Sequence, residues 1–298
     1  MRVGITGASG LIGTALVSHL KGNGHDTVTF VRRTATSSSE ISWDPANGTL
    51  DAKALEGLDA VVHLAGAGIG DKRWSTAYKQ EILDSRTKST SLLASRMASL
   101  DKKPGVFLSG SAIGIYGARG DEELNETSSH GSSFLASVCE EWESATHEAQ
   151  SAGVRTVHLR TGIVLSPKGG ALKKQLPLFK LGLGGRFGKG SQWQSWISIT
   201  DEVRAISHLL TSSLSGPVNL TAPTPVTNTD FTRILASVVK RPALLPIPGF
   251  GPKLLLGSEL ADALLFTGQR VIPTALANDG YMFTHSTLDV ALRDLLGK

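Results

Sequence analysis

The chain has a single cysteine, Cys139, among its 298 residues. One thiol cannot form an internal disulfide or a cysteine metal site, so we expect a buried cysteine on a helix. No uncharged apolar stretch reaches the roughly 18 residues of a transmembrane helix, which excludes a membrane span. Because a strand is expected from residue 2 onward, no signal peptide is predicted ahead of the fold, and the expected location is the cytoplasm.

Several sequence patterns of other protein classes are also missing. The net charge is +4, but the basic residues come as separated pairs, so neither nucleic acid nor a membrane surface is an expected partner. The eight histidines form no H-x-x-x-H pair, and no metal site is predicted. No G-x-S-x-G elbow occurs, which excludes the usual α/β serine hydrolase. The expected partner is a small-molecule substrate of unknown identity, bound by a monomer or homodimer.

Apolar runs and longer amphipathic segments alternate along the chain. Strands are expected at residues 2–6, 27–31, 59–64, 106–109, 156–160 and 218–221. Helices are expected at 11–21, 78–100, 134–152 and 201–214. This alternation predicts an α/β fold, a Rossmann-like doubly wound parallel sheet.

Two segments differ from this alternation and indicate a second lobe. Residues 169–198 interrupt the pattern before its last helix and strand, and prolines punctuate short apolar helices from Pro223 onward. We therefore predict a dinucleotide-binding domain made of residues 1–168 and 199–222. A smaller, mostly C-terminal substrate-binding lobe would comprise residues 169–198 and 223–298.

The first expected strand leads into a glycine-rich turn and then a helix. The spacing is G-x-x-G-x-x-G, and the strand-to-helix context indicates a phosphate-binding turn rather than a tight turn without a ligand. A helix that starts here would direct its first amides at a pyrophosphate. The residues expected to contact a dinucleotide are Thr6, Gly7, Ser9, Gly10, Leu11, Ile12 and Gly13.

The end of the second strand favours NADP(H) over NAD(H). Enzymes that use NAD usually carry an acidic residue there, which holds the ribose hydroxyls. This chain has Val31 followed by Arg32 and Arg33. Guanidinium groups bind a 2′-phosphate through charge-assisted hydrogen bonds, although two solvated arginines at a strand end would give the same sequence.

Several longer motifs give the chain a family resemblance. They are DAVVHLAGA at 59–67, LSGSA at 108–112, LRTGIVL at 159–165, LGLGG at 181–185, WISITD at 196–201 and GQRVIP at 268–273. With these motifs the chain resembles the extended short-chain dehydrogenase/reductase superfamily, and within it the atypical, epimerase-family proteins. The further cofactor contacts that the resemblance implies are Leu64, Ala65, Gly66, Ser109, Gly110, Thr161, Gly162 and Val164.

In that superfamily a serine and a Tyr-x-x-x-Lys pair transfer protons. Ser111 matches the serine, but Phe134 and Val138 stand where the tyrosine and lysine belong. Neither side chain has a proton to exchange, so the usual acid and base are missing. Ser111 remains a candidate donor to a substrate carbonyl or a partner in a local bond. Tyr116 is a candidate catalytic residue or a core tyrosine.

The resemblance places a substrate pocket in the second lobe, with candidate residues Gly185, Gln192 and Trp196. Two functions stay open. One is an NADP(H)-dependent oxidoreductase or epimerase that acts on a hydroxyl or carbonyl of a small, nucleotide-linked or free substrate, with a proton from Tyr116, an acidic residue such as Glu122, water or the substrate. The other is a non-catalytic NADP(H)-binding sensor or scaffold.

Overall fold

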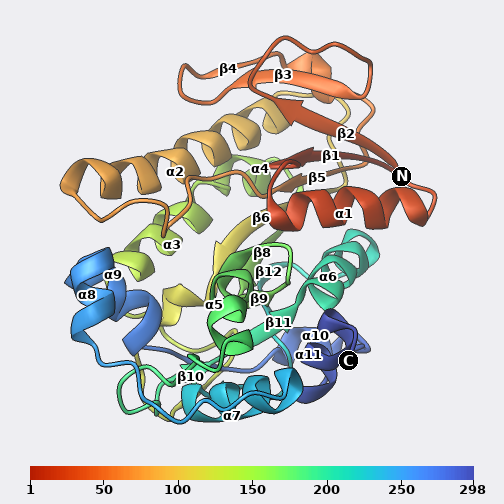
Figure 1. Ribbon diagram of the computed structural model, residues 1–298. Helices are drawn as coiled ribbons and strands as arrows, with labels where there is room; N and C mark the ends of the chain where they lie inside the picture. Colours follow the sequence, from red (N-terminus) through yellow and green to blue (C-terminus); the bar gives the residue numbers. More distant parts are fainter.

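The computed structural model describes residues 1–298 and has one large sheet at its centre, with helices on both faces (Figure 1). Its strands are β1 (Arg2–Thr6), β2 (Asp26–Val31), β3 (Glu40–Asp44), β4 (Thr49–Leu50), β5 (Ala60–His63), β6 (Val106–Ala112), β8 (Arg155–Thr161) and β12 (Gly216–Leu220). Their order is β12-β8-β6-β5-β1-β2-β3-β4, and all pairs are parallel except β3 with β4. The expected α/β class is confirmed.

The remaining elements lie around this sheet. The helices are α1 (Leu11–Gly22), α2 (Thr76–Ala98), α3 (Phe134–Ser144), α4 (His147–Ser151), α5 (Gly170–Lys180), α6 (Ile199–Thr211), α7 (Asn228–Val239), α8 (Phe250–Leu256), α9 (Ser258–Ala261), α10 (Thr274–Asn278) and α11 (Leu288–Leu296). Two-stranded pairs join β7 (Glu123–Leu124) with β14 (Arg270–Val271), β9 (Ile163–Leu165) with β11 (Trp196–Ser198), and β10 (Trp193–Gln194) with β13 (Val226–Thr227). None of the helices is long and apolar enough to span a bilayer.

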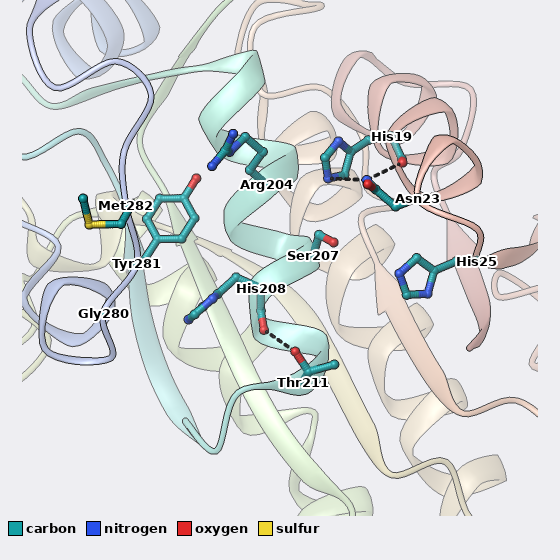
Figure 2. Close-up of a pocket in the computed structure, with 10 residues that line it drawn as sticks. All are labelled: His19, Asn23, His25, Arg204, Ser207, His208, Thr211, Gly280, Tyr281 and Met282. Carbon is teal, nitrogen blue, oxygen red and sulfur yellow. Dashed lines mark hydrogen bonds between the residues drawn. The ribbon is translucent and has the colours of Figure 1, made fainter.

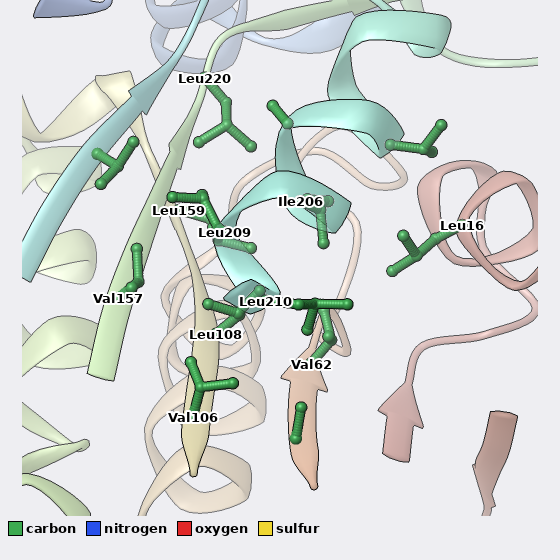
Figure 3. Packing of buried hydrophobic residues seen from close by; sticks show 14 of the residues in the cluster. Leu16, Val62, Val106, Leu108, Val157, Leu159, Ile206, Leu209, Leu210 and Leu220 are labelled. Atoms are coloured by element: carbon green, nitrogen blue, oxygen red, sulfur yellow. The ribbon is translucent and has the colours of Figure 1, made fainter. Parts of the chain in front are cut away.

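Side chains along the central strands alternate between two apolar layers, as the pleat requires. Val62 and Leu108 lie in the layer under α1 and α6, which Leu16 and Ile206 also enter (Figure 3). Their neighbours in sequence, including Val61, belong to the opposite layer, which α2 and α4 cover. Burial on both faces explains why these strands read as continuous apolar runs.

A separate apolar cluster lies away from the main sheet. It joins α5, α7 and α11 with β11, and Trp196 is its largest fully buried side chain. Its residues come mainly from the segments 169–198 and 223–298, together with the end of β9. The fully buried indole of Trp196 donates to the Thr224 carbonyl, 3.0 Å away, which fixes β11 against the loop that precedes β13.

The strand order creates a crevice at one end of the sheet. β1 pairs with β2 on one side and with β5 on the other. The strands that follow β1 are therefore added first on one side of it and then on the other, so the strand order reverses at β1. Ligands of open α/β sheets bind at such a reversal, outside the carboxyl ends of the strands. In this chain those ends are Thr6 of β1 and His63 of β5, which lie in register.

Two local expectations differ from the structure. The helix expected at 134–152 is broken after Ser144, because the Thr146 hydroxyl donates back to the Glu143 carbonyl at 2.7 Å and also contacts His158 on β8. Strand β3 was not expected. The alternation of buried Ile41 and Trp43 with less buried neighbours is nevertheless the pattern of a half-exposed strand.

Candidate functional site

The turn between β1 and α1 needs glycine at two positions. Gly7 has φ +65°, and a Cβ there would lie 2.7 Å from the Leu64 carbonyl group. A Cβ on Gly13 would lie only 2.2 Å from the Gly7 carbonyl oxygen. Helix α1 therefore starts in close contact with the end of β1, as dinucleotide-binding turns require.

The first turn of α1 has no side-chain cap. Gly10 is the N-cap residue, and no side chain accepts a hydrogen bond from the first amides of the helix. Amides at a helix N-terminus that lack such a partner form an anion-binding site, which the helix dipole strengthens. The local geometry thus fits a pyrophosphate.

A cavity of about 350 Å³ opens at this turn and extends over the carboxyl ends of β5, β6 and β8. Nine of the expected cofactor contacts line it, namely Gly7, Gly10, Leu11, Ile12, Gly13, Leu64, Gly110, Thr161 and Val164, and so does the catalytic candidate Ser111. Ile163, within the motif at 159–165, also lines it, as do three residues that sequence reasoning missed: Trp142, Gly170 and Ala171. In the sequence Trp142 has the pattern of an ordinary apolar helix residue. In the structure a Cβ on Gly110 would lie 2.6 Å from the Trp142 ring, so Gly110 and Trp142 together form one wall of the cavity.

Thr6 holds the loop after β5 rather than facing the cavity. Its side chain is fully buried, and its hydroxyl accepts from the amides of Leu64 and Ala65 at 3.1 and 3.2 Å. The same hydroxyl lies 2.7 Å from Nδ1 of His63, which is buried as well. Burial, and secondarily the charge of Arg86, lower the pKa of His63 to about 3, so this imidazole is neutral. The Thr6 side chain thus positions this loop, and its contact with a dinucleotide stays a prediction.

Five other expected cofactor residues do not line the cavity. Ser9 and Gly66 are exposed, and Ala65 is half-buried in the loop that Thr6 holds. Ser109 is sealed inside the sheet, and its hydroxyl has no partner. Gly162 allows close contact of two backbones, because a Cβ there would lie 2.5 Å from the Ser195 carbonyl oxygen.

The two arginines after β2 differ in their partners. Arg33 makes two hydrogen bonds with Glu40 on β3, at 2.6 and 2.8 Å, and these lower the pKa of Glu40 to about 2. Arg32 is exposed and makes no hydrogen bond or ion pair. Sequence reasoning missed this difference because Glu40 belongs to the unexpected strand β3. Arg32 is therefore the guanidinium that is available for a ligand.

Ser111 uses its proton within the protein. Its hydroxyl donates to Oε1 of Glu143 at 2.6 Å, so the expected donation to a substrate carbonyl, and the alternative of a bond to backbone, are both replaced by this contact. Arg160 donates to both oxygens of the same carboxylate at 2.8 and 2.9 Å. Burial pushes the pKa of Glu143 upward, but the bonds from Arg160 and His158 outweigh it and lower the pKa to about 2. The oxygen of Ser111 remains on the cavity wall as an acceptor.

Tyr116 is a core residue. Its ring is fully buried, its hydroxyl donates to Asn219 at 2.7 Å, and the same hydroxyl accepts from Arg160 at 3.0 Å. Burial raises the pKa of Tyr116 in spite of the nearby Arg160. Because the phenol is sealed and does not line the cavity, the structure supports the alternative of a core tyrosine over a catalytic one.

Phe134 and Val138 lie on the face of α3 toward α2, where they make apolar contacts. The Phe134 ring packs edge to face on Trp74, with centroids 5.1 Å apart. Val138 is buried against Tyr78 and Ile82 of α2. No tyrosine and lysine pair therefore faces the cavity from this helix. Cys139, the next residue, is buried as expected, and burial together with the charge of Glu143 raises the pKa of its thiol to about 12.

None of the three candidates for a substrate pocket lines the cavity at the glycine turn. Trp196 is fully buried in the second apolar cluster. Gln192 donates to the carbonyls of Phe187 and Leu265, at 3.2 and 2.6 Å. Gly185 is tightly packed, because a Cβ there would lie 2.0 Å from the Leu245 carbonyl oxygen. Glu122, the acidic alternative, is exposed and paired with Arg119.

Glu202 is a buried acid close to the cavity wall. It lies in the first turn of α6 and is fully buried. Oε1 accepts from the hydroxyl of Thr161 at 3.0 Å, whereas Oε2 has no partner. Burial raises the pKa of Glu202 to about 8, and the bond from Thr161 offsets only part of this shift. Near neutral pH the carboxyl group is therefore mostly protonated.

This raised pKa predicts a stability that falls with pH. A glutamate in an unfolded chain has a pKa of about 4.3. Between about pH 4.5 and 8 the folded chain therefore holds a proton on Glu202 that the unfolded chain has lost. Each pH unit in this window lowers the free energy of unfolding by about 1.4 kcal/mol. We expect Glu202→Gln to remove this term, so that its Tm falls less than that of the wild type between pH 6.5 and 8.

The control for this experiment is Glu148→Gln, at an exposed position on α4. Calorimetric scans of this variant should follow the wild type at each pH. The buried His63 is neutral when folded and titrates near about pH 6.5 when unfolded, so it adds a slope of opposite sign that fades above about pH 7.5. This slope is the same in all three proteins and cancels from the comparison. Equal pH slopes for wild type and Glu202→Gln would contradict the assignment of a protonated Glu202.

A second cavity, of about 530 Å³, lies at the opposite end of α1 (Figure 2). His19 and His208 stand there in the last turns of α1 and α6, where basic side chains favour the carbonyl ends of helices. His208 also pairs with Asp279 at 2.7 Å. These contacts account for the polar lining, and no group of three metal-ligating side chains occurs in the molecule.

The comparison with protein-family models agrees with the turn and the cavity. Residues 3–220 match the model of the NAD-dependent epimerase/dehydratase family. The chain belongs to this family. Residues 247–295 also match a domain of unknown function, DUF1731. The family match includes the whole glycine turn and, apart from the first residue of β1, all strands of the central sheet.

Relatives and solved structures cover nearly the whole chain. Epimerase family protein Mb2239 of Mycobacterium bovis is 45% identical over 97% of this chain and 96% of its own length. The chloroplastic SDR39U1 homolog of Arabidopsis thaliana is 35% identical over 99% and 87%. The human epimerase family protein SDR39U1, solved with NADPH, has a TM-score of 0.91 at 31% identity and covers 100% of this chain and 99% of its own.

A longer relative shares the same fold. The nucleoside-diphosphate sugar epimerase of Corynebacterium glutamicum has a TM-score of 0.82 and 37% identity. The match covers 100% of this chain but 58% of that protein. The arrangement of sheet and second apolar cluster therefore also occurs within a larger polypeptide.

Proposed function

We propose that this epimerase-family protein binds NADPH and uses it as an oxidoreductase or epimerase on a hydroxyl or carbonyl of a small substrate, such as a nucleotide-linked sugar. The observation that carries the proposal is the uncapped α1 terminus, which opens onto a cavity across the strand-order reversal. NADPH supplies hydride when bound. The related human protein, solved with NADPH, supports the choice of cofactor.

The orientation of the dinucleotide follows from the two ends of the site. Arg32, after β2, is the group that would receive the 2′-phosphate. The pyrophosphate would meet the α1 amides, and the nicotinamide half would then lie toward β6 and β8, against Ser111 and Thr161. The segments 169–198 and 223–298 would cover the substrate on that side.

Ser111 would accept a hydrogen bond from a substrate hydroxyl, because its own proton is already donated to Glu143. Tyr116 is sealed from the cavity, and the side chains of Phe134 and Val138 have no exchangeable proton. None of these three residues would therefore transfer a proton to the substrate. Absorbance of the nicotinamide band during a screen of sugar nucleotides, aldehydes and quinones tests the proposal. Saturable NADPH oxidation supports an enzyme.

The second candidate function is a non-catalytic NADPH-binding sensor or scaffold. The sealed phenol of Tyr116 and the apolar pair Phe134 and Val138 favour it, because the cavity then lacks an evident proton donor. Tight NADPH binding without turnover across the whole screen would support this function and contradict the enzymatic one.

The free guanidinium predicts which arginine sets cofactor preference. We expect NADPH to bind at least tenfold more tightly than NADH, a ratio in the range of about tenfold to a hundredfold that one charge-assisted hydrogen bond provides. Arg32→Gln should remove most of this ratio by weakening NADPH alone. Isothermal titration calorimetry with both cofactors measures it.

Arg33→Gln is the matched control, because the Arg33 guanidinium is already bonded to Glu40. Its effect on the NADPH to NADH ratio should be smaller than that of Arg32→Gln. Equal affinities of the wild type for the two cofactors would sink the NADP assignment. A larger loss in Arg33→Gln would reverse the assigned roles of the two arginines.

A further inference from the structure

Arg86 of α2 is a buried cation without a carboxylate partner. Its side chain is 7% exposed, and no ion pair includes it. One guanidinium nitrogen, Nη1, donates to the carbonyls of Ala67 and Ile82, each at 3.0 Å. Burial lowers the pKa of Arg86. A buried charge with only neutral acceptors is costly, so a further partner is to be expected.

The guanidinium lies beside the wall of the dinucleotide cavity. It stacks on the ring of Trp142, which lines the cavity, with 5.0 Å from Cζ to the ring centroid. A Cβ on Gly66, in the loop after β5, would lie 3.3 Å from the same Cζ atom. Arg86 is thus held between the Trp142 ring and the loop that follows β5.

Two donors of Arg86 are unused by the protein. Nε and Nη2 donate to no protein atom, and neither is sealed from solvent. Arg160, the other strongly buried arginine near this wall, is neutralised by Glu143. Position 138 on the neighbouring helix contributes only an apolar valine. Arg86 therefore carries the buried positive charge on this side of the cavity that no carboxylate neutralises.

We propose that Arg86 donates hydrogen bonds to the nicotinamide half of bound NADPH, at the oxygens of its ribose and adjoining phosphate. The inference rests on the proposed function. The glycine turn and Arg32 would hold the pyrophosphate and the adenosine end, and Ser111 lies on β6, two strands from β1, on the side that would receive the nicotinamide half. Trp142 of α3 lines the cavity together with Ser111. These oxygens supply both the acceptors and the negative charge that the guanidinium lacks.

A purely structural role makes a different prediction. If Arg86 serves only to bond two carbonyls and to stack on Trp142, its loss affects all ligands of the site alike or none of them. A contact with one half of the dinucleotide affects only ligands that contain this half. Adenosine 2′,5′-bisphosphate contains the adenosine end and lacks the nicotinamide ribose, so it serves as the second probe.

The experiment compares NADPH and adenosine 2′,5′-bisphosphate by calorimetry on wild type, Arg86→Met and Arg86→Lys. Arg155→Met is the matched control, because Arg155 also donates only to backbone carbonyls, at 2.8 to 3.1 Å, but from the far end of β8. We expect Arg86→Met to weaken NADPH by about tenfold to a hundredfold and to leave the bisphosphate unchanged. Arg86→Lys should lose less, and Arg155→Met should change neither affinity.

Three results would overturn the inference. They are unchanged NADPH affinity in Arg86→Met, an equal loss for both probes, and an equal loss in Arg155→Met. If Arg86→Met does not fold, Arg86→Lys decides, because its shorter reach should weaken NADPH and spare the bisphosphate. A wild type that binds neither probe would refute the proposed function itself, whereas a wild type that binds both, with an unaffected Arg86→Met, refutes only the role of Arg86.

Discussion

Gly13→Ala is expected to weaken NADPH binding by about tenfold or more and to lower the free energy of unfolding by about 1–3 kcal/mol. The added Cβ would lie 2.2 Å from the Gly7 carbonyl oxygen and 2.7 Å from Cα of Ala8. Both are backbone atoms, so the turn has to move away from α1. The amides that would bind the pyrophosphate move with it. Calorimetric titration and thermal unfolding measure the two losses.

Gly22→Ala is the control on the same helix. Gly22 is the last residue of α1, and an added Cβ would meet no atom within 4 Å. Alanine is the better helix former, so this variant should be unchanged or up to about 1 kcal/mol more stable, with unchanged NADPH affinity. If Gly13→Ala behaved like Gly22→Ala, the tight packing of the glycine turn would be unimportant for the site.

Glu143→Gln is expected to lower the free energy of unfolding by about 3 kcal/mol, because it leaves the buried charge of Arg160 without an anion. Arg160 is 3% exposed, and both oxygens of Glu143 accept its hydrogen bonds. The amide of glutamine can accept at one position but carries no charge. Chemical denaturation at neutral pH gives the difference.

The same substitution one turn earlier on α3 provides the control. Glu140 pairs with His130 at 2.9 Å, and both side chains are substantially exposed. Surface pairs contribute about 0–1 kcal/mol, so Glu140→Gln should change stability little. Comparable losses in the two variants would mean that burial of Arg160 adds nothing to the cost. Glu143→Gln should also change the hydrogen bond of Ser111 at the cavity.

The sequence predicted the fold and the glycine turn because both depend on short-range patterns. Buried parallel strands appear as apolar runs, and a strand-to-helix turn of closely packed backbones requires glycine at positions such as Gly7 and Gly13. The absence of an exchangeable side-chain proton at Phe134 and Val138 is likewise a property of single residues. These features need no knowledge of distant contacts.

The polar contacts of the site could not be predicted in the same way. Ser111, Glu143 and Arg160 come from β6, α3 and β8, and only the packing of α3 on the sheet joins them. Arg33 is neutralised by Glu40. Glu40 begins the short strand β3, which follows a polar segment at 34–39 and was not predicted from the sequence. Side-chain pairing across elements depends on register and rotation, which periodicity alone does not determine.

The single thiol has a practical consequence for measurements in solution. Cys139 is buried on α3, and its pKa of about 12 keeps it in the unreactive thiol form. A thiol-reactive fluorophore or spin label would therefore react only with a cysteine introduced at an exposed position, and the native Cys139 need not be removed. A label on a cysteine introduced at Leu254, which is exposed on α8, could then report changes around that helix during NADPH titration in an otherwise unaltered chain.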